Sequence, residues 1–262
     1  MLEIKFFWKF LGRKVINFFS ELGKLFILLF SILRYFPNIF RDKKLILQQM
    51  AIIGVDSLPL VLLVGIFTGA IAALQATTLF DKFNLMDIAK TFLGGSISTA
   101  VFQELTPVLT ALVITGRVGG SMAAQIGAMQ ITEQIDAIEI MAIDKNRYLG
   151  MPRIVATLFM MPLLAVFSSI IALLGAYIMV IVKFNISPTL YIDSIKNFFA
   201  ISELIVCLVK SACFGGITSL IGVYVGFNTS GGAEGVGQST VKAFTISAAV
   251  ILILDAVFGL IL

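Results

Sequence analysis

The sequence predicts an all-α integral membrane protein: an amphipathic interfacial helix, then five transmembrane helices with a short cytoplasmic helix between two of them. Of the 262 residues, 59% are hydrophobic and only 13% are charged, and five apolar stretches are long enough to cross a bilayer. The mean hydropathy is +1.03. A soluble domain of this length needs a more highly charged surface, so most of this surface must meet lipid.

A basic arm precedes the long apolar stretches. Residues 1–49 hold nine Lys and Arg against three Asp and Glu, a net charge of +6, while the rest of the chain has a net charge of −2. Because Lys and Arg gather on the cytoplasmic side of membrane proteins, the N-terminus is expected in the cytoplasm. Across residues 4–36 the basic residues alternate with Phe, Leu and Ile at helical spacing, which favours a membrane surface over nucleic acid as their partner. This predicts one or two interfacial helices ending at Pro37, in an N-terminal region of residues 1–45.

Five later stretches each exceed the ~20 residues that cross a hydrocarbon core. The expected crossings are residues 50–80, 94–126, 154–182, 203–227 and 241–262. The second is longer than needed and contains Pro107, so it is expected to tilt or kink. Small residues four positions apart predict faces where helix backbones approach closely. They are Gly65/Gly69, Gly116/Gly120/Ala124 and Gly222/Gly226.

The order of the crossings predicts the topology. With the N-terminus inside, the connections 127–153 and 228–240 are cytoplasmic, and 81–93, 183–202 and the C-terminus lie outside. The 127–153 connection carries three basic residues, which agrees with this orientation. Lys82, Lys90, Lys183 and Lys196 on the other side do not, so the orientation depends on the basic arm.

Several chemistries are excluded by what the sequence lacks. Histidine is absent, and the two cysteines, Cys207 and Cys213, have no metal-ligand spacing. The stretch 232–239 nearly fits a phosphate-binding loop, but Gln238 stands where the loop needs lysine and no strand precedes it. We therefore expect no catalytic residue, metal or cofactor, no nucleotide site and no enzymatic activity. The glycines of residues 226–240 are expected to form a tight turn.

A short amphipathic helix is predicted over residues 130–141. Ile131, Ile135, Ile138 and Ala142 share one helical stripe, whereas Glu133, Asp136 and Glu139 point elsewhere. Such a helix either docks in a groove of another protein or is simply solvated, and periodicity alone does not choose between the two.

Six ionisable residues fall inside or beside the apolar stretches: Asp56, Glu104, Arg117, Glu203, Lys210 and Asp255. A charge at membrane depth costs about 2.5–3.5 kcal/mol on insertion scales, so it usually faces a partner or a wet cavity. Arg117 and Glu203 could instead reach an interface. For Glu104, Lys210 and Asp255 the alternatives are a functional cavity and a plain interhelical ion pair.

A series of motifs resembles the MlaE/YrbE permease family, in order and at the family's spacing from about residue 45 to the end. The matching residues are Glu104 to Pro107, Gly116 to Ser121, Thr132 to Met141, Asp144, Pro152 and Arg153, Lys210 and Ser211, the glycine-rich turn, and Leu254 and Asp255. The resemblance implies a permease domain over residues 46–262.

The resemblance further implies the permease subunit of an ABC transporter that works as a homodimer. The implied partners are a cytoplasmic ABC ATPase and an MCE-domain substrate-binding protein, with a STAS-type regulator in some systems. The implied substrate is phospholipid moved between inner and outer membranes. The implied location is the inner membrane, or the inner envelope in a plastid.

The resemblance also assigns candidate roles to residues. The cytoplasmic helix would be the coupling helix on the ATPase, with Glu133, Gln134, Asp136, Ile138 and Glu139. The substrate cavity would include Gln103, Glu104, Lys210 and Asp255. Lys210 would attract phosphate, with Thr106, Thr110 and Ser211 as polar neighbours. Gln103 departs from the arginine of some relatives, so no cation is expected there.

Two other functions compete with this interpretation. The first is an ion-coupled secondary transporter that uses Glu104, Lys210 and Asp255, although the sequence shows neither repeat symmetry nor paired broken helices. The second is a non-transporting membrane scaffold that anchors other envelope proteins.

Overall fold

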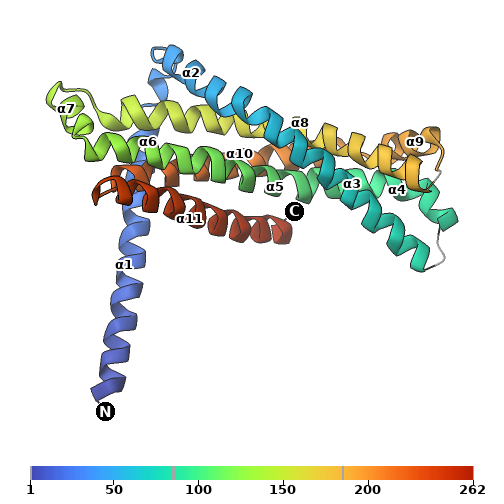
Figure 1. Cartoon of the computed structure of the whole chain (residues 1–262), viewed down its shortest axis with the longest axis horizontal. Helices are drawn as coiled ribbons and strands as arrows, with labels where there is room; N and C mark the ends of the chain where they lie inside the picture. The colour runs from blue at the N-terminus through green and yellow to red at the C-terminus, as the bar shows by residue number, and fades with distance from the viewer. Residues whose placement is uncertain (1, 84–85, 185, 262) are drawn as a thin grey trace.

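The computed structural model describes residues 2–83, 86–184 and 186–261, with the side chains of 2–11, 14, 17, 18 and 86–90 outside the description. Within these ranges every regular element is helical, which confirms the predicted fold class (Figure 1). The α-helices are α1 (Leu2–Leu33), α2 (Lys43–Gly54), α3 (Leu58–Lys82), α4 (Met86–Ala100), α5 (Thr106–Ile114), α6 (Gly120–Ile131), α7 (Gln134–Ile140), α8 (Met151–Phe184), α9 (Pro188–Phe198), α10 (Ile201–Phe227) and α11 (Gly232–Ile261). Short 3-10 turns, η1 (Phe36–Asn38) and η2 (Val55–Ser57), and π-helical turns, η3 (Val101–Leu105), η4 (Thr115–Gly119) and η5 (Asn146–Gly150), join them.

Five helical stretches are long and apolar enough to cross a membrane, as predicted. They are Lys43–Lys82, Thr91–Ile131, Asn146–Phe184, Ile201–Phe227 and Gly232–Ile261. The longest has 41 residues, which is about 60 Å of helix at 1.5 Å per residue, against about 30 Å of hydrocarbon. The crossings are thus longer than the apolar windows predicted, because the helices continue past the segment that lipid covers.

Three expected connections differ from the structure. The glycine-rich turn is confined to residues 228–231, because α11 begins at Gly232 rather than at residue 241. Gly231 and Gly232 adopt φ values of 94° and 68°, which glycine alone tolerates well. The outer connections 81–93 and 183–202 are partly helical, since they contain the start of α4 and the whole of α9.

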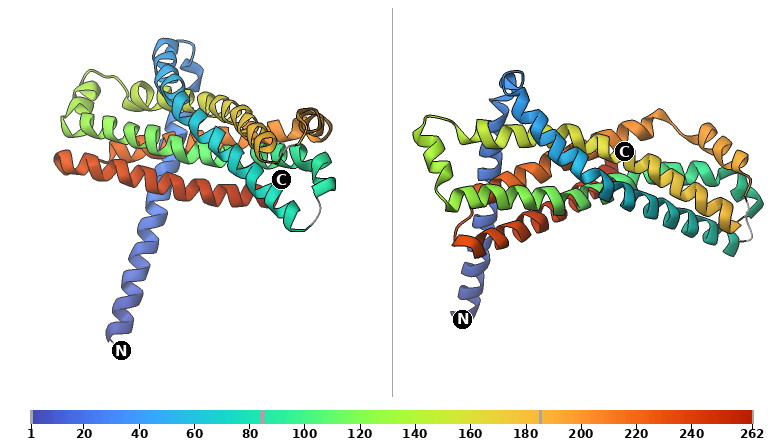
Figure 2. Two further views of the ribbon diagram at one scale, coloured as in Figure 1. Left: turned by 45° about the vertical axis from the view of Figure 1, so that its right-hand side comes forward. Right: turned by 45° about the horizontal axis from the view of Figure 1, so that its top comes forward.

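The long helices lie side by side with α7 at one end of the bundle and α4 and α9 at the other (Figures 1 and 2). Helix α1 is one continuous helix that runs across the direction of the bundle near the α7 end, with its N-terminus far from the other helices. That direction is suited to a helix lying in the plane of the membrane. The expected amphipathic face of residues 4–11 lies outside the described side chains.

Apolar packing and hydrogen bonds attach α1 to the bundle, and Ser31 accepts one such bond from Asn146 Nδ2 at 3.0 Å. Ile32 is buried, with 1% of its surface exposed, and packs near Gly150. Glu21 accepts hydrogen bonds from Tyr224 Oη at 2.6 Å and from Lys24 Nζ at 3.0 Å. These bonds lower the pKa of the Glu21 carboxyl, which favours its ionised form.

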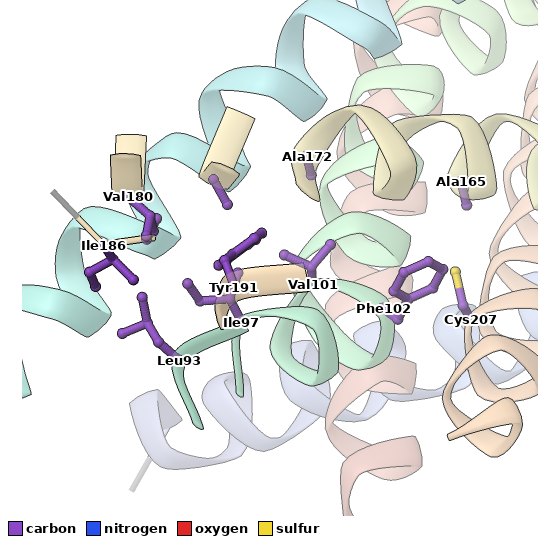
Figure 3. Close-up of a cluster of buried hydrophobic side chains, with 12 residues drawn as sticks. Leu93, Ile97, Val101, Phe102, Ala165, Ala172, Val180, Ile186, Tyr191 and Cys207 are labelled. Atoms are coloured by element: carbon purple, nitrogen blue, oxygen red, sulfur yellow. The ribbon is translucent and has the colours of Figure 1, made fainter. Parts of the chain in front are cut away.

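The largest buried cluster joins α4, α8, α9 and α10 in the half of the bundle away from α7 (Figure 3). Leu93, Ile97, Val101 and Phe102 come from α4 and η3, and they face the alanines of α8, such as Ala165 and Ala172. Tyr191 of α9, Cys207 of α10 and Ala73 of α3 also belong to it. Because alanines line one side, the bulky side chains of the other side fit between closely spaced helices.

Glycine lets α3 and α8 touch backbone to backbone. A Cβ at Gly69 would lie 1.7 Å from Ala172 O, and one at Gly175 would lie 2.2 Å from Ile66 O. A Cβ at Gly222 would likewise lie 2.9 Å from Gly119 O. The close approaches predicted from the small-residue spacing are therefore confirmed at Gly69 and Gly222, but not at Gly116, where an added Cβ would meet only the Phe244 ring at 3.6 Å.

Substituting Gly69 with alanine should destabilise the protein, because its methyl group would meet rigid backbone and force α3 away from α8. We expect Gly69→Ala to lose about 1–3 kcal/mol, as for other overpacked interiors. Thermal unfolding of the purified protein in detergent measures the loss. Gly259→Ala is the matched control, since nothing lies within 4 Å of its added methyl. Equal midpoints for the two variants would contradict the close helix contact.

Candidate functional site

The second crossing is interrupted where the candidate cavity residues lie. The π-helical turn η3 contains Gln103 and Glu104, and Pro107 follows it in the first turn of α5. Proline has no N–H, so it cannot bond to the carbonyl of Gln103 four residues earlier. The neighbouring Thr106 Oγ1 donates to a different carbonyl, Val101 O, at 2.6 Å. The carbonyl of Gln103 is left available to a donor from another helix. Interruptions of this kind are frequent at functional sites.

That donor is Lys210 of α10. Its ammonium donates to Gln103 O at 3.0 Å, to Glu104 Oε1 at 2.9 Å and to Asp255 Oδ1 of α11 at 3.1 Å. An ammonium group has three protons, so all of them are used. The lysine side chain is only 1% exposed. Three of the four expected cavity side chains thus meet, and Gln103 contributes its backbone. We call these four residues the Lys210 cluster.

The charges of the Lys210 cluster are unevenly exposed. The side chain of Glu104 is 50% exposed and that of Asp255 is 22% exposed, whereas Lys210 is enclosed. Two carboxylates surround one cation, so the ionised cluster has a net charge of −1. The exposed side of the cluster is therefore a hydrogen-bond acceptor with negative charge, and the ammonium is held behind it.

This geometry alters two expectations. Lys210 was expected to attract phosphate, but its three protons are already donated inside the bundle. Thr106, Thr110 and Ser211 were expected to add polar groups around the cluster, but all three are buried. Thr106 shares a hydrogen bond with Ser169 at 2.6 Å, and Ser211 donates to Cys207 O at 2.6 Å. Thr106 thus joins α5 to α8, Ser211 bonds within its own helix, and the Thr110 hydroxyl is buried without a partner, so none of the three is open to a ligand.

The predicted cytoplasmic helix is α7, which is shorter than the expected span of 130–141. It begins at Gln134 because Glu133 has a left-handed backbone, with φ 57°, and ends at Ile140 before Ala142, with φ 59°. Ile135 is completely buried, and Ile131 and Ile138 are partly buried. Within α7 the apolar stripe is therefore confirmed at Ile135 and Ile138, whereas Ile131 ends α6 and Ala142 lies beyond α7 and is exposed.

The outward side of α7 is acidic and apolar. Glu133, Asp136 and Glu139 are exposed, and Glu139 pairs with Lys145 at 3.0 Å. Ile140 is 86% exposed and Met141 is 64% exposed. Exposed apolar side chains beside carboxylates make a surface suited to a partner groove that is both apolar and basic.

Sequence reasoning missed how the segment after α7 is held. Asp144 accepts hydrogen bonds from Tyr35 Oη at 2.8 Å and from the backbone N–H of Asn146 at 2.8 Å. Arg147 makes two hydrogen bonds to Asp42, at 3.0 Å and 3.1 Å. The bond to Asp144 raises the pKa of the Tyr35 hydroxyl. Segment 141–147 is thus tied to the connection between α1 and α2. The match of Asp144 to the family's motifs marked this residue, but it did not indicate which residues Asp144 contacts.

The other ionisable residues singled out lie apart from the Lys210 cluster. Glu203 is buried, at 5% exposed, and accepts a hydrogen bond from Thr99 at 2.7 Å. Arg117 donates to Ser57 and Asp56 is exposed. Among the described residues, no group of three or more His, Cys, Asp or Glu side chains could hold a metal ion.

Comparison with known proteins gives matches along almost the whole chain. Residues 46–261 match the family described as permease MlaE. A probable ABC transporter permease protein of Rickettsia typhi is 36% identical over 246 residues, which cover 92% of each chain. The intermembrane phospholipid transport system permease protein MlaE of Haemophilus influenzae is 31% identical, over 94% of this chain and 93% of its own. The chloroplastic protein trigalactosyldiacylglycerol 1 of Arabidopsis thaliana is 32% identical, over 81% of this chain and 60% of its own.

Removing the cation from the Lys210 cluster should destabilise the bundle. In Lys210→Met, two carboxylates and one carbonyl lose their donor, and breaking a buried pair in this way costs about 3–5 kcal/mol. The triple variant Lys210→Met/Glu104→Gln/Asp255→Asn should recover most of the loss, because no uncompensated charge remains. The apparent thermal midpoint in detergent is the measurement. Lys196→Met, at an exposed lysine, is the control. A midpoint for Lys210→Met equal to that of the control would show that the cluster is not a structural tie.

Proposed function

The chain belongs to the MlaE permease family, and we propose that it is the permease subunit of an ABC transporter that moves phospholipid between inner and outer membranes. It is a multi-pass membrane permease, a transport component. The observation that carries the phospholipid assignment is the match, over nearly the full length of both chains, to the Haemophilus influenzae protein whose name states that substrate. A separate ATPase subunit would supply the energy.

The proposed ATPase contact is α7. Its buried Ile135 anchors the helix to the bundle, while Glu133, Gln134, Asp136 and Glu139 are exposed. Ile138 is half-buried between the two sides. A helix fixed on one face and exposed on the other can transmit a push from its partner to the bundle, because segment 141–147 is tied to the start of α2.

The proposed substrate contact is the exposed side of the Lys210 cluster. Glu104 offers a half-exposed carboxylate at membrane depth, and Lys210 positions Glu104 and Asp255 by donating to both. Gln103 accepts from Lys210 through its backbone, so its side chain remains a separate polar group. A lipid site combines apolar walls for the chains with a few polar groups for the headgroup. Carboxylates suit the amino or hydroxyl donors of a phospholipid headgroup.

The proposed assembly is the one that membership of the family implies. It is a homodimer with a cytoplasmic ABC ATPase, an MCE-domain substrate-binding protein and, in some systems, a STAS-type regulator. The N-terminus and α7 are proposed to face the cytoplasm, in the inner membrane or in a plastid inner envelope. We divide the chain into an interfacial region, 1–45, and a permease domain, 46–262, a division supported by a family match that begins at residue 46.

Reconstitution tests the proposed function. The permease and its ATPase, placed together in vesicles, should move fluorescent phospholipid to a binding-protein acceptor only when ATP is hydrolysed. Glu104→Gln should slow this movement and leave ATP binding by the ATPase unchanged. The alternative with a specific observation in its favour is ion coupling through the paired carboxylates of the Lys210 cluster. Lipid movement that follows an ion gradient without ATP would favour it and contradict the ABC mechanism.

Reversing the acidic edge of α7 should weaken recruitment of the ATPase. Because Glu139 pairs with Lys145, the change is restricted to Glu133→Lys and Asp136→Lys, which break no ion pair with any described residue. Like charges across a docking surface oppose association, so we expect affinity to fall at least about tenfold, or ~1.4 kcal/mol. Co-purification across a salt series measures it. The control is Asp81→Lys/Asp193→Lys, at exposed acids of the opposite end. Unchanged recruitment at physiological salt would remove α7 from the interface.

A further inference from the structure

A groove of mixed chemistry lies between α2 and α6, in the half of the bundle nearer α7. Its volume is about 230 Å³. Gln49, Arg117, Ser121 and Gln125 supply its polar groups, and Ile52, Ile53, Val118 and Met122 supply its apolar wall. None of these residues belongs to the Lys210 cluster, and Arg117 is 13 positions beyond Glu104, or about 20 Å along a helix.

Arg117 brings a positive charge into this groove without an opposite charge beside it. Its Nη1 donates to Ser57 Oγ, and none of the described carboxylates forms an ion pair with it. A guanidinium has five N–H donors, so donors remain for a ligand. A cation inside an apolar crossing usually faces a partner or a wet cavity. In the bundle itself, the partner of Arg117 is a neutral hydroxyl group.

A second guanidinium stands behind the groove. Arg153 is 8% exposed and donates to Leu149 O at 2.9 Å and to Gln125 Oε1 at 3.5 Å. Its Nε is buried without a partner, and it too has no ion pair among the described residues. Because Gln125 turns its carbonyl oxygen toward Arg153, its amide N–H groups are left for the groove. Two guanidinium groups that form no ion pair with a described carboxylate favour an anionic ligand in the groove.

The depth of Arg117 is suited to a lipid headgroup. Thr115 and Thr218 share a hydrogen bond at 2.8 Å, so Arg117 lies near the level of Thr218. Tyr224, which bonds to α1, is six residues further along α10, or about 9 Å. If α1 marks the interface, Arg117 lies just below the headgroup layer on the α7 side.

We propose that this groove binds the phosphate group of a phospholipid drawn from the leaflet next to α7, with Arg117 as the principal ligand. Arginine presents two parallel N–H groups that match two oxygens of a phosphate. Gln49 can donate to the same group, and Ile52 and Met122 can contact the glycerol and upper acyl chains. The Ser121 hydroxyl donates to Val118 O at 3.1 Å, so it only adds polarity to the wall. This inference rests on the proposed function, because it adds a second headgroup site to a phospholipid permease. The new site is positively charged, whereas the Lys210 cluster is negatively charged. Free phosphate has the same anionic chemistry, so the test separates the two sources.

Photolabelling tests the proposal on the full-length protein. The probe is phosphatidylcholine with a diazirine in its headgroup, in phosphatidylcholine vesicles, and labelled peptides are mapped by mass spectrometry. Wild-type protein should be labelled within residues 49–53 and 118–125. Arg117→Met should lower that labelling at least about tenfold, as expected for the loss of a bidentate phosphate contact. Arg117→Lys should retain part of it. Arg41→Met, at an exposed arginine outside the groove, is the control. Equal labelling of Arg117→Met and wild type would overturn the proposal.

Two further arms identify the source of the phosphate. A diacylglycerol probe with the same chains and diazirine, but no phosphate, should label the groove no more than Arg117→Met does. Excess inorganic phosphate should not displace the phosphatidylcholine probe, and displacement would overturn the assignment to lipid. Should Arg117→Met fail to fold, Gln49→Leu removes a neutral donor alone and should lower labelling severalfold.

The labelling map separates this inference from the proposed function. Labelling near Glu104 together with an unlabelled groove would reject the headgroup site while phospholipid transport stands. ATP-dependent transport that stays intact in Arg117→Met, with labelling lost, would keep the site and make it non-essential to transport. Labelling of the groove in a protein that moves no phospholipid would reject the proposed function alone.

Discussion

The enclosed ammonium of Lys210 sets the strictest condition on the structure. A buried cation inside a membrane bundle is tolerated only if its charge and its protons are satisfied. Here that requires one acceptor from α11 and two from η3, which brings three crossings to fixed positions along their lengths. The π-helical turn and Pro107 meet the condition together, because the proline frees the Gln103 carbonyl and the turn carries Glu104. The exposed carboxylate of Glu104 is thereby held in place by a group that lipid cannot reach.

The remaining helices stabilise this arrangement by close approach. In lipid, apolar burial gives little drive for helices to associate, so packing of small residues takes its place. The contact of Gly69 with Ala172, and the alanines of α8 beneath Phe102, allow α3, α4 and α8 to pack tightly. Hydrogen bonds such as Thr99 to Glu203 and Thr106 to Ser169 also join the helices along the bundle. At the α7 end, Asp144 and Arg147 bond to the connection between α1 and α2.

Much of the fold could be predicted from the sequence, because apolar length and glycine spacing are local signals. The five crossings, the close contacts at Gly69 and Gly222, and the deep position of Lys210 follow from such signals. The start of α11 at Gly232 could not, since a hydropathy window detects lipid contact and not helix ends. The three acceptors of Lys210 could not either, because they come from distant segments. Only Pro107 gave a local signal, because a proline four residues after Gln103 leaves the Gln103 carbonyl without its usual helical N–H donor.

The α7 end and the membrane interior are mechanically continuous. Asp42 is the residue before α2, and its carboxylate makes no cap to that helix but bonds twice to Arg147 instead. A displacement of segment 141–147 must therefore act on α2, since charge-assisted bidentate bonds are short and directional. Helix α2 carries Gln49, which lines the groove that contains Arg117. It continues through η2 into α3, whose Gly69 packs against the backbone of α8. The bonds of segment 141–147 thus end beside the helix that lines the groove, whereas the bonds of Lys210 join η3, α10 and α11.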